Sequence, residues 1–394
     1  MLETGVMFDF YIPTHLLFGA GKIHMLHKCE MPGTKALIVI TNGKSTIRNG
    51  YLDTVKKELD MTGCSYAVFD GVYANPVTRN IQEGAAAAKE NGCDFVIGLG
   101  GGSAIDACKA IALMAANPGN VWDYIQMGSG GKQKVQRKPL PVIAVTTTAG
   151  TGTEADSAFV VTNEETKEKI GFYHPDLFPV ISVADAEMMA TVPPKFTAYQ
   201  GFDALFHSIE GYICNKPNVF CDMLIETVIQ NIAENLPIAV ADGTNLAARE
   251  RVALGNTLSG FQMSTGNLTA EHSLEHAMSA FHEALPHGAG LVMISIAYYQ
   301  HLTQAPKLQQ RFIKMAKLMG KKDADKAEDF PNALQQLIET CGIGDLKMSQ
   351  YGITPDEFPK FVKNARSTMG SKFENEYLEL TDEDCIKIYQ ESYR

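Results

Sequence analysis

DFVIGLGGGS, residues 94–103, is an apolar run that leads into three consecutive glycines, and the fold of the first half of the chain can be worked out from it. An apolar run of this length before glycines is typical of a strand buried on both faces. Residues 104–115 then have the composition of a helix. Because glycine reaches backbone angles closed to other residues, Gly100, Gly101 and Gly102 permit a ligand to approach the main chain.

The end of this turn is suited to an anion. Ser103 stands where a helix N-cap is expected, and the first N–H groups of a helix, with its positive dipole end, bind phosphate. The alternative is that the glycines only permit close packing of the helix on the strand. The pattern is not the usual GxGxxG fingerprint, so an ordinary dinucleotide fold is not the first inference. The turn predicts a phosphate-bearing ligand.

Apolar runs separated by helical lengths predict a parallel sheet of an α/β unit. A second polar turn, TTTAGTGTE (residues 146–154), follows one of these runs. Such turns often line the ligand crevice of an open α/β sheet, although a polar loop with capping threonines explains it equally well. Strands are predicted at residues 35–41, 65–69, 94–99, 141–146 and 180–183, and helices between them at residues such as 51–61 and 78–91.

A change of pattern follows the sequence VPP (residues 192–194), after which nearly every segment has helical character. The length of 394 residues suits two domains. We predict an α/β dinucleotide-binding domain at residues 1–192 and an all-helical metal-binding and catalytic domain at residues 193–394. The helices predicted there span residues 196–214, 219–236, 247–263, 270–282, 288–303, 307–319, 324–341 and 380–393.

Charge and cysteine content narrow the class of protein. With 34 Lys and Arg against 45 Asp and Glu, the formal net charge is −11, which argues against nucleic acid or an anionic membrane as the main partner. The eight cysteines are scattered without a CxxC pair, as in proteins of a reducing compartment. Residues 1–19 lack the features of a signal peptide, and no apolar stretch is long enough to span a bilayer. We therefore expect a cytoplasmic protein.

The helical half carries a candidate metal-binding pattern. Asp203 and His207 are four residues apart, as are His272 and His276, so each pair lies on one helix face. His287 follows in a Pro-His-Gly turn. Mixed imidazole and carboxylate sets favour divalent transition metals.

A structural role for these histidines is the alternative, because a single helical histidine is most often a surface or hydrogen-bonded core residue. His282 is off the face shared by His272 and His276, and we take it as structural or adjacent to the substrate. A divalent cation polarises an alcohol or carbonyl oxygen, and a phosphate-bearing cofactor on the glycine turn would complete a site for hydride transfer.

Taken together, these motifs resemble those of the iron-dependent (group III) alcohol dehydrogenases, and the similarity runs through nearly the whole chain. The resemblance implies a dehydroquinate-synthase-like two-domain fold, with a Rossmann-like α/β domain, an all-helical domain and a metal in the cleft between them, usually Fe(II) and sometimes Zn(II). The matching motifs are GGGSAIDACKA (100–110), TTTAGT (146–151), GFDALFHSIEGY (201–212), HSLEH (272–276) and PHG (286–288).

The resemblance also implies roles for individual residues. The implied metal ligands are Asp203, His207, His272 and His287. His276 matches a histidine that is not a ligand and that relays a proton or positions the nicotinamide or substrate. The implied cofactor-binding residues are Asn75, Gly101, Gly102, Ser103, Asp106, Thr147, Thr148 and Lys169.

Two departures from the family pattern matter. Many members have an aspartate where this chain has Asn42, and that aspartate favours NAD by repelling the 2′-phosphate of NADP. Asn42 removes the repulsion, and Lys44 or Ser45 can contact a phosphate, so we expect NADP to be accepted as well as NAD. Alternatively, Lys44 is only a solvated loop charge. The spacing from His272 to His287 is also one residue longer than in many members, and we expect the extra residue to reshape the substrate pocket.

The sequence thus predicts a metal-dependent, NAD(P)-linked alcohol dehydrogenase or aldehyde reductase. Hydride would move between nicotinamide and a small primary alcohol, diol or aldehyde at the metal. We expect a homodimer or larger homo-oligomer. The alternatives are a glycerol-dehydrogenase-like enzyme, a dehydroquinate-synthase-like lyase, or a metal- or nucleotide-binding protein without turnover.

Overall fold

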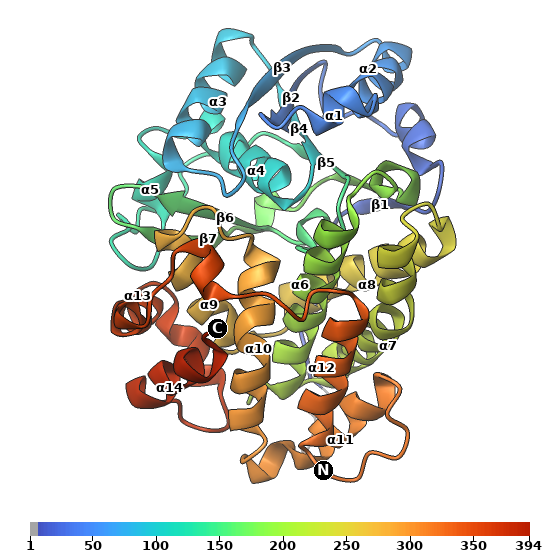
Figure 1. Cartoon of the computed structure of the whole chain (residues 1–394). Helices are drawn as coiled ribbons and strands as arrows, with labels where there is room; N and C mark the ends of the chain where they lie inside the picture. The colour runs from blue at the N-terminus through green and yellow to red at the C-terminus, as the bar shows by residue number, and fades with distance from the viewer. Residues whose placement is uncertain (1–6) are drawn as a thin grey trace. The chain divides into compact units, whose positions relative to one another are not determined.

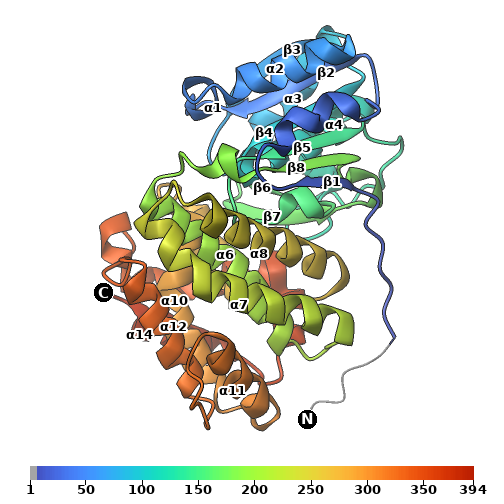
Figure 2. The ribbon, with the colours of Figure 1, turned by 90° about the vertical axis from the view of Figure 1, so that its right-hand side faces the viewer.

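The computed structural model describes residues 7–394. The first six residues, which belong to the predicted first domain and to the segment searched for a signal peptide, lie outside the described part. The chain divides into two compact units: one is Tyr11–Thr191, and the other joins residues 7–10 to Val192–Arg394. The boundary predicted after residue 192 is one residue later than this division, and residues 7–10 group with the helical unit. Figures 1 and 2 show both units.

The first unit is built on a six-stranded sheet in which every neighbouring pair is parallel. Its strand order is β1-β8-β5-β4-β2-β3, which can be followed in Figure 2. The strands are β1 (His15–Phe18), β2 (Lys35–Thr41), β3 (Ser65–Val72), β4 (Phe95–Gly100), β5 (Val142–Thr146) and β8 (Ile181–Ala184).

Both faces of the sheet are covered, which is why its strands are apolar throughout rather than alternating. On β2, Leu37 and Val39 belong to the core that includes residues of α3 (Thr78–Glu90) and α4 (Gly102–Ala116). The alternate residues Ala36 and Ile38 belong to the core formed with the 3-10 helix η1 (Lys22–Lys28) and α2 (Tyr51–Thr62). The predicted parallel sheet therefore forms as expected.

Two glycines of β4 bring α4 close to the sheet. A Cβ on Gly98 would lie 2.9 Å from the Cα of Ile105, so only a residue without a side chain permits this approach of helix and strand. Gly100 has φ +152°, which L side chains rarely adopt. Gly98 and Gly100 are thus required by the packing of α4 and by the strand-to-helix turn, before any ligand is considered.

A two-stranded antiparallel sheet follows the second polar turn: β6 (Ala158–Asn163) pairs with β7 (Glu168–Tyr173). The remaining short helices of this unit are α1 (Ser45–Arg48) and α5 (Val121–Tyr124).

The second unit is helical. Its α6 begins at Pro194, where a proline is tolerated because the first helical N–H has no intrahelical partner. Packing of α6 with α7 and α8 can be seen in Figure 2. The helices are α6 (Pro194–Ile213), α7 (Val219–Ala241), α8 (Leu246–Thr265), α9 (Glu271–Phe281), α10 (His287–Leu302), α11 (Gln309–Leu318), α12 (Asp329–Thr340), α13 (Phe358–Met369) and α14 (Asp382–Ser392).

Among the described helices, none is both long enough and apolar enough to cross a membrane. All eight cysteines are free thiols, as the scattered spacing predicted.

Candidate functional site

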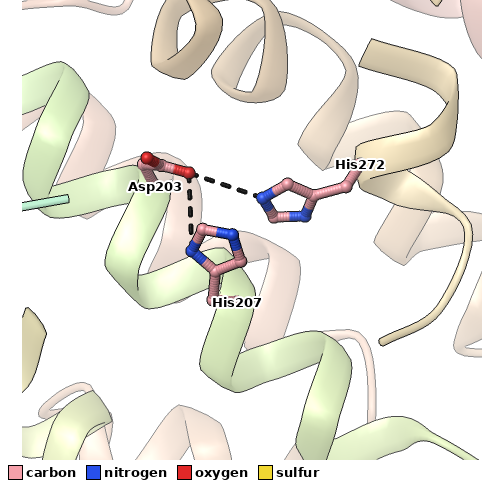
Figure 3. A group of neighbouring side chains, drawn as sticks. All are labelled: Asp203, His207 and His272. Carbon is pink, nitrogen blue, oxygen red and sulfur yellow. Dashed lines mark hydrogen bonds and ion pairs between the residues drawn. The ribbon is translucent and has the colours of Figure 1, made fainter. Parts of the chain in front are cut away.

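Asp203 and His207 lie on α6, one turn apart, and His272 belongs to α9 (Figure 3). Relative exposures are 4% for Asp203, 8% for His207 and 3% for His272. The three residues form a group whose ligand atoms all lie within 4.8 Å of one another. Charged side chains are rarely this buried without a compensating partner, so this group marks a site.

One carboxylate oxygen is shared by three imidazoles. The Oδ1 atom of Asp203 is 3.5 Å from Nδ1 of His207 and 3.4 Å from Nε2 of His272. It is also 3.4 Å from Nε2 of His287, the first residue of α10. These distances are long for hydrogen bonds to a carboxylate. Two ligands bound to one tetrahedral ion at about 2.0–2.2 Å are themselves about 3.4 Å apart, so the spacing fits a shared cation.

The charged side chains at this site favour the binding of a cation. Burial by itself would raise the pKa of Asp203, but the imidazoles of His207 and His287 outweigh burial and hold that pKa well below its usual range. Burial would lower the pKa of His272, but the carboxylates of Glu210 and Asp203 raise it to about 10. The surrounding charges thus stabilise a cation at this place.

Two buried glutamates hold the far sides of the imidazoles. Glu210 contacts Nδ1 of His272 and accepts the backbone N–H of His272 at 3.2 Å. Glu275 contacts Nδ1 of His287. A carboxylate on the second ring nitrogen fixes the tautomer that leaves the first nitrogen free for a metal. Sequence reasoning assigned no role to either glutamate, although both stand within the motifs, seven residues after Asp203 and three after His272.

His276 is buried beside this cluster. Its ring centroid lies 5.2 Å from that of His287 and 6.4 Å from that of His272. Glu275, His276 and His287 form a second group of possible ligands. In the described contacts, however, Glu275 holds Nδ1 of His287 while Nε2 of that ring faces Asp203. The group around Asp203 is therefore the better candidate for the ion.

His282 anchors the loop between α9 and α10. Its Nε2 lies 3.0 Å from Oε2 of Glu357, and its Nδ1 lies 3.1 Å from the carbonyl oxygen of Tyr351. Both partners are acceptors, and together they fix the orientation of the ring. Of the two roles considered for His282, these contacts support the structural one.

In the first unit, the glycine turn gathers several of the predicted cofactor-binding residues. Ser103 Oγ accepts the N–H of Asn75 at 3.3 Å, and the N–H of Thr147 donates to the carbonyl of Gly100 at 2.9 Å. A Cβ on Gly101 would lie 2.8 Å from Oγ1 of Thr148. Among the described residues, no side chain caps the start of α4. Its first N–H groups are suited to an anion.

Asp106 faces the protein interior. Its Oδ1 accepts from Oγ1 of Thr153 at 2.7 Å, and its Oδ2 accepts the N–H of Val160 at 2.9 Å. Burial raises the pKa of Asp106 to about 6. Both oxygens thus hold the loop that follows β5.

Lys109, one turn further along α4, is fully buried and was given no role from the sequence. Its Nζ lies 2.7 Å from Oδ1 of Asp156 and 2.8 Å from Oγ1 of Thr153, so it fixes the same loop. The helix α4 begins at Gly102, two residues before the predicted start at residue 104, so Ser103 lies in its first turn and not at its N-cap as expected.

The remaining predicted cofactor residues lie on other elements of the first unit. Lys169 is on β7, opposite Thr162, and is 6% exposed. Asn42 is exposed just after β2, and Lys44 has φ +60° at the start of α1. The segment from Asn42 to Arg48, which is exposed except at Thr46, contains no acidic residue.

These features define a class: a metal-binding, nucleotide-dependent enzyme with a parallel α/β unit and a helical unit. Family models refine it. "Iron-containing alcohol dehydrogenase" matches residues 13–186, and "Fe-containing alcohol dehydrogenase family, C-terminal" matches residues 197–393. The chain therefore belongs to the iron-containing alcohol dehydrogenase family, and it is an oxidoreductase that acts on alcohols.

Known relatives are similar in sequence to this chain over nearly its whole length. The chain is 32% identical over 377 residues to the 1,3-propanediol dehydrogenase of Klebsiella pneumoniae, covering 94% of this chain and 95% of that protein. It is 30% identical over 369 residues to the NAD-dependent methanol dehydrogenase of Bacillus methanolicus, covering 91% and 93%.

The crystal structure of the archaeal Red Sea brine pool alcohol dehydrogenase ADH/D1 superposes with a TM-score of 0.93 at 29% identity, over 99% of this chain and 100% of that one. The family, fold class and enzyme class predicted from the sequence are confirmed.

Proposed function

We propose that this chain interconverts small primary alcohols or diols and their aldehydes with a nicotinamide dinucleotide, using Fe(II) or Zn(II). The metal would be held by Asp203, His207, His272 and His287. The observation that carries this assignment is the single Asp203 Oδ1 with three imidazole nitrogens at 3.4–3.5 Å. Oxygen and imidazole donors of this kind suit iron and zinc alike.

A bound divalent cation would act as a Lewis acid that polarises the alcohol or carbonyl oxygen. The side chains of this chain prepare the site for it. Glu210 and Glu275 orient two imidazoles, and the low pKa of Asp203 keeps its carboxylate charged. Burial of Asp203, His207 and His272 lowers the local dielectric constant and strengthens these charge interactions.

The dinucleotide would bind through the glycine turn. The N–H groups at the start of α4 would donate to the pyrophosphate, beside Asn75 and Ser103. Thr147 and Thr148 stand next to the same turn. Asp106 and Lys109 act by fixing the loop that follows β5. A role for Lys169 in contacting the ribose stays a prediction.

His276 is the candidate for moving a proton. Replacing His276 with Ala should leave metal content near the wild-type value and lower kcat by about a hundredfold, because a positioned acid or base contributes about 10²–10⁴. Metal analysis and a pH profile of kcat would measure this. Loss of the metal together with activity would instead make His276 a ligand.

We expect NADPH to be accepted alongside NADH, because no acidic side chain stands in the segment from Asn42 to Arg48. Comparing kcat/KM for the two cofactors tests this, and a strong preference for NADH would contradict it. Asn42→Asp should lower kcat/KM with NADPH by about tenfold relative to NADH, because a carboxylate repels the 2′-phosphate. Asn49→Asp, an exposed change in the same unit, is the matched control.

The relatives' names make diols and methanol the first substrates to try. Metal analysis of anaerobically purified protein, combined with aldehyde reduction before and after chelation, tests the proposed function as a whole. Turnover that survives complete metal removal would contradict it, and cofactor binding without any turnover would favour a non-catalytic protein.

We also predict that the enzyme is a homo-oligomer and that it is cytoplasmic. The sedimentation coefficient measures the oligomeric state, and cell fractionation measures the location.

A further inference from the structure

A row of buried polar side chains begins at Glu210, which orients the candidate metal ligand His272, and continues through residues that have no role in the proposed function. Glu210 contacts Nδ1 of His272 through Oε1. Its Oε2 accepts from Oγ1 of Thr269 at 3.2 Å. Thr269 Oγ1 lies 3.1 Å from the hydroxyl of Tyr298 on α10, and that hydroxyl also contacts Oε1 of Glu376. The row therefore runs from His272 to a glutamate more than a hundred residues away in sequence.

Three oxygen-to-oxygen contacts in this row each require one proton, but the two hydroxyl groups supply only two. The contacts join Glu210 to Thr269, Thr269 to Tyr298, and Tyr298 to Glu376. Each hydroxyl has a single hydrogen, and an ionised carboxylate has none to donate. The third proton must therefore be carried by a carboxyl group at one end of the row.

The surroundings of the two glutamates assign that proton. Glu210 accepts two N–H groups of His272 on Oε1 and the hydroxyl of Thr269 on Oε2, so both of its oxygens have hydrogen-bond partners. Glu376 accepts a single N–H, that of Ala270 at 3.0 Å, and its Oε2 is buried without a hydrogen-bond partner among the described residues. A buried charged oxygen without a partner is far more costly than a neutral one.

Ionisable groups on four surrounding elements face Glu376, and all are acids. They are Glu210 on α6, Glu271 at the start of α9, Tyr298 on α10 and Cys385 on α14. Burial raises the pKa of Glu376 from 4.5 to about 8. Electrostatics and proton counting therefore agree that the proton is on Glu376 at neutral pH.

We propose that Glu376 is a positioning residue: as an un-ionised acid it begins a chain of hydrogen bonds that ends on Nδ1 of His272. All hydrogen bonds then point from Glu376 towards Glu210, whose carboxyl group holds the ring so that Nε2 faces Asp203. The inference rests on the proposed function, because it gives Glu376 a part in holding the metal ligand.

The first test locates the proton in the metal-free, full-length protein. Infrared spectroscopy separates the carbonyl stretch of an un-ionised acid from that of a carboxylate. The wild type minus Glu376→Gln difference should show that stretch at pH 7 and lose it as the pH rises through about 8. Glu374→Gln, an exposed neighbour, should leave the band unchanged. A carboxylate band at pH 7 would overturn the assignment.

The second test measures whether the hydrogen-bond chain affects metal binding. Metal-free protein is titrated with Co(II), and the visible absorption of the bound Co(II) is followed. Thr269→Val keeps the shape but removes the hydroxyl, and should weaken Co(II) binding about tenfold, as loss of a supporting hydrogen bond does. Thr269→Ser should restore affinity, and Glu376→Gln should retain it at pH 7 because the amide still donates. Thermal melting by circular dichroism checks that each variant folds.

The outcomes are distinct. If wild-type protein binds neither Co(II) nor Zn(II), the proposed function fails. If the wild type binds Co(II), and folded Thr269→Val binds it equally with the same absorption spectrum, the metal site stands and the positioning chain is overturned.

Discussion

Asp203→Asn should lose most of its metal and at least about 10³ in kcat/KM for aldehyde reduction. The reason is that Oδ1 of Asp203 is the atom shared by three imidazoles, while asparagine is neutral and presents an amide of nearly the same shape. A Lewis-acid cation contributes several kcal/mol of transition-state stabilisation, and about 4 kcal/mol corresponds to roughly 10³ in rate. Metal content by elemental analysis and steady-state kinetics under anaerobic conditions are the measurements.

Glu234→Gln, on the exposed face of α7, is the matched control and should retain both metal and activity. A cooperative melting curve of Asp203→Asn would show that the variant is folded, so that unfolding does not account for the loss of metal and activity. Full activity of folded Asp203→Asn with a full complement of metal would show that the ion lies elsewhere.

Ser103→Asp should raise the Kd for NADH by about a hundredfold without destabilising the fold. Ser103 lies in the first turn of α4, where a carboxylate interacts favourably with the helix dipole. The same carboxylate would repel the pyrophosphate: two like charges about 5 Å apart at an effective dielectric constant of about 20 repel by about 3 kcal/mol. Fluorescence titration with NADH and thermal melting separate the two effects.

Ser103→Ala is the control, since it removes the hydroxyl that accepts the N–H of Asn75 but adds no charge, and its effect on Kd should be less than about tenfold. If Ser103→Asp binds NADH as tightly as the wild type and is equally stable, the pyrophosphate does not bind at the start of α4.

Much of the first unit could be predicted from the sequence. The strand at Lys35–Thr41 was predicted with its observed bounds, because the interior of a strand covered on both faces is apolar throughout and the run ends where the chain reaches solvent. From the sequence, the segment Phe8–Phe18 could either pair strands across a two-fold axis or complete the sheet of its own chain. In the structure His15–Phe18 is an edge strand of that sheet, paired with β8 alone among the described strands. The hairpin β6–β7 was missed because its strands mix buried and less buried residues and follow a long polar turn.

Helical segments were predicted more reliably than their ends. The predicted helix at residues 307–319 divides into a 3-10 turn at Pro306–Leu308 and an α-helix beginning at Gln309. The helix α13 was not predicted, although Phe358, Phe361 and Val362 form a buried stripe at helical spacing. The second residue of this helix is a proline, which usually indicates a break in a helix but is tolerated at a helix start, so the helical pattern was not recognised.

The sequence by itself determined the family, the α/β and helical halves, and the residues that could bind a metal, because glycines before a helix and an i, i+4 spacing are local features of the chain. Only the tertiary structure decided that His287 faces the same oxygen as His207 and His272, and that Glu210 and Glu275 support the imidazoles from behind. Those contacts join residues on different helices, and their distances depend on how buried side chains pack, which no local spacing specifies.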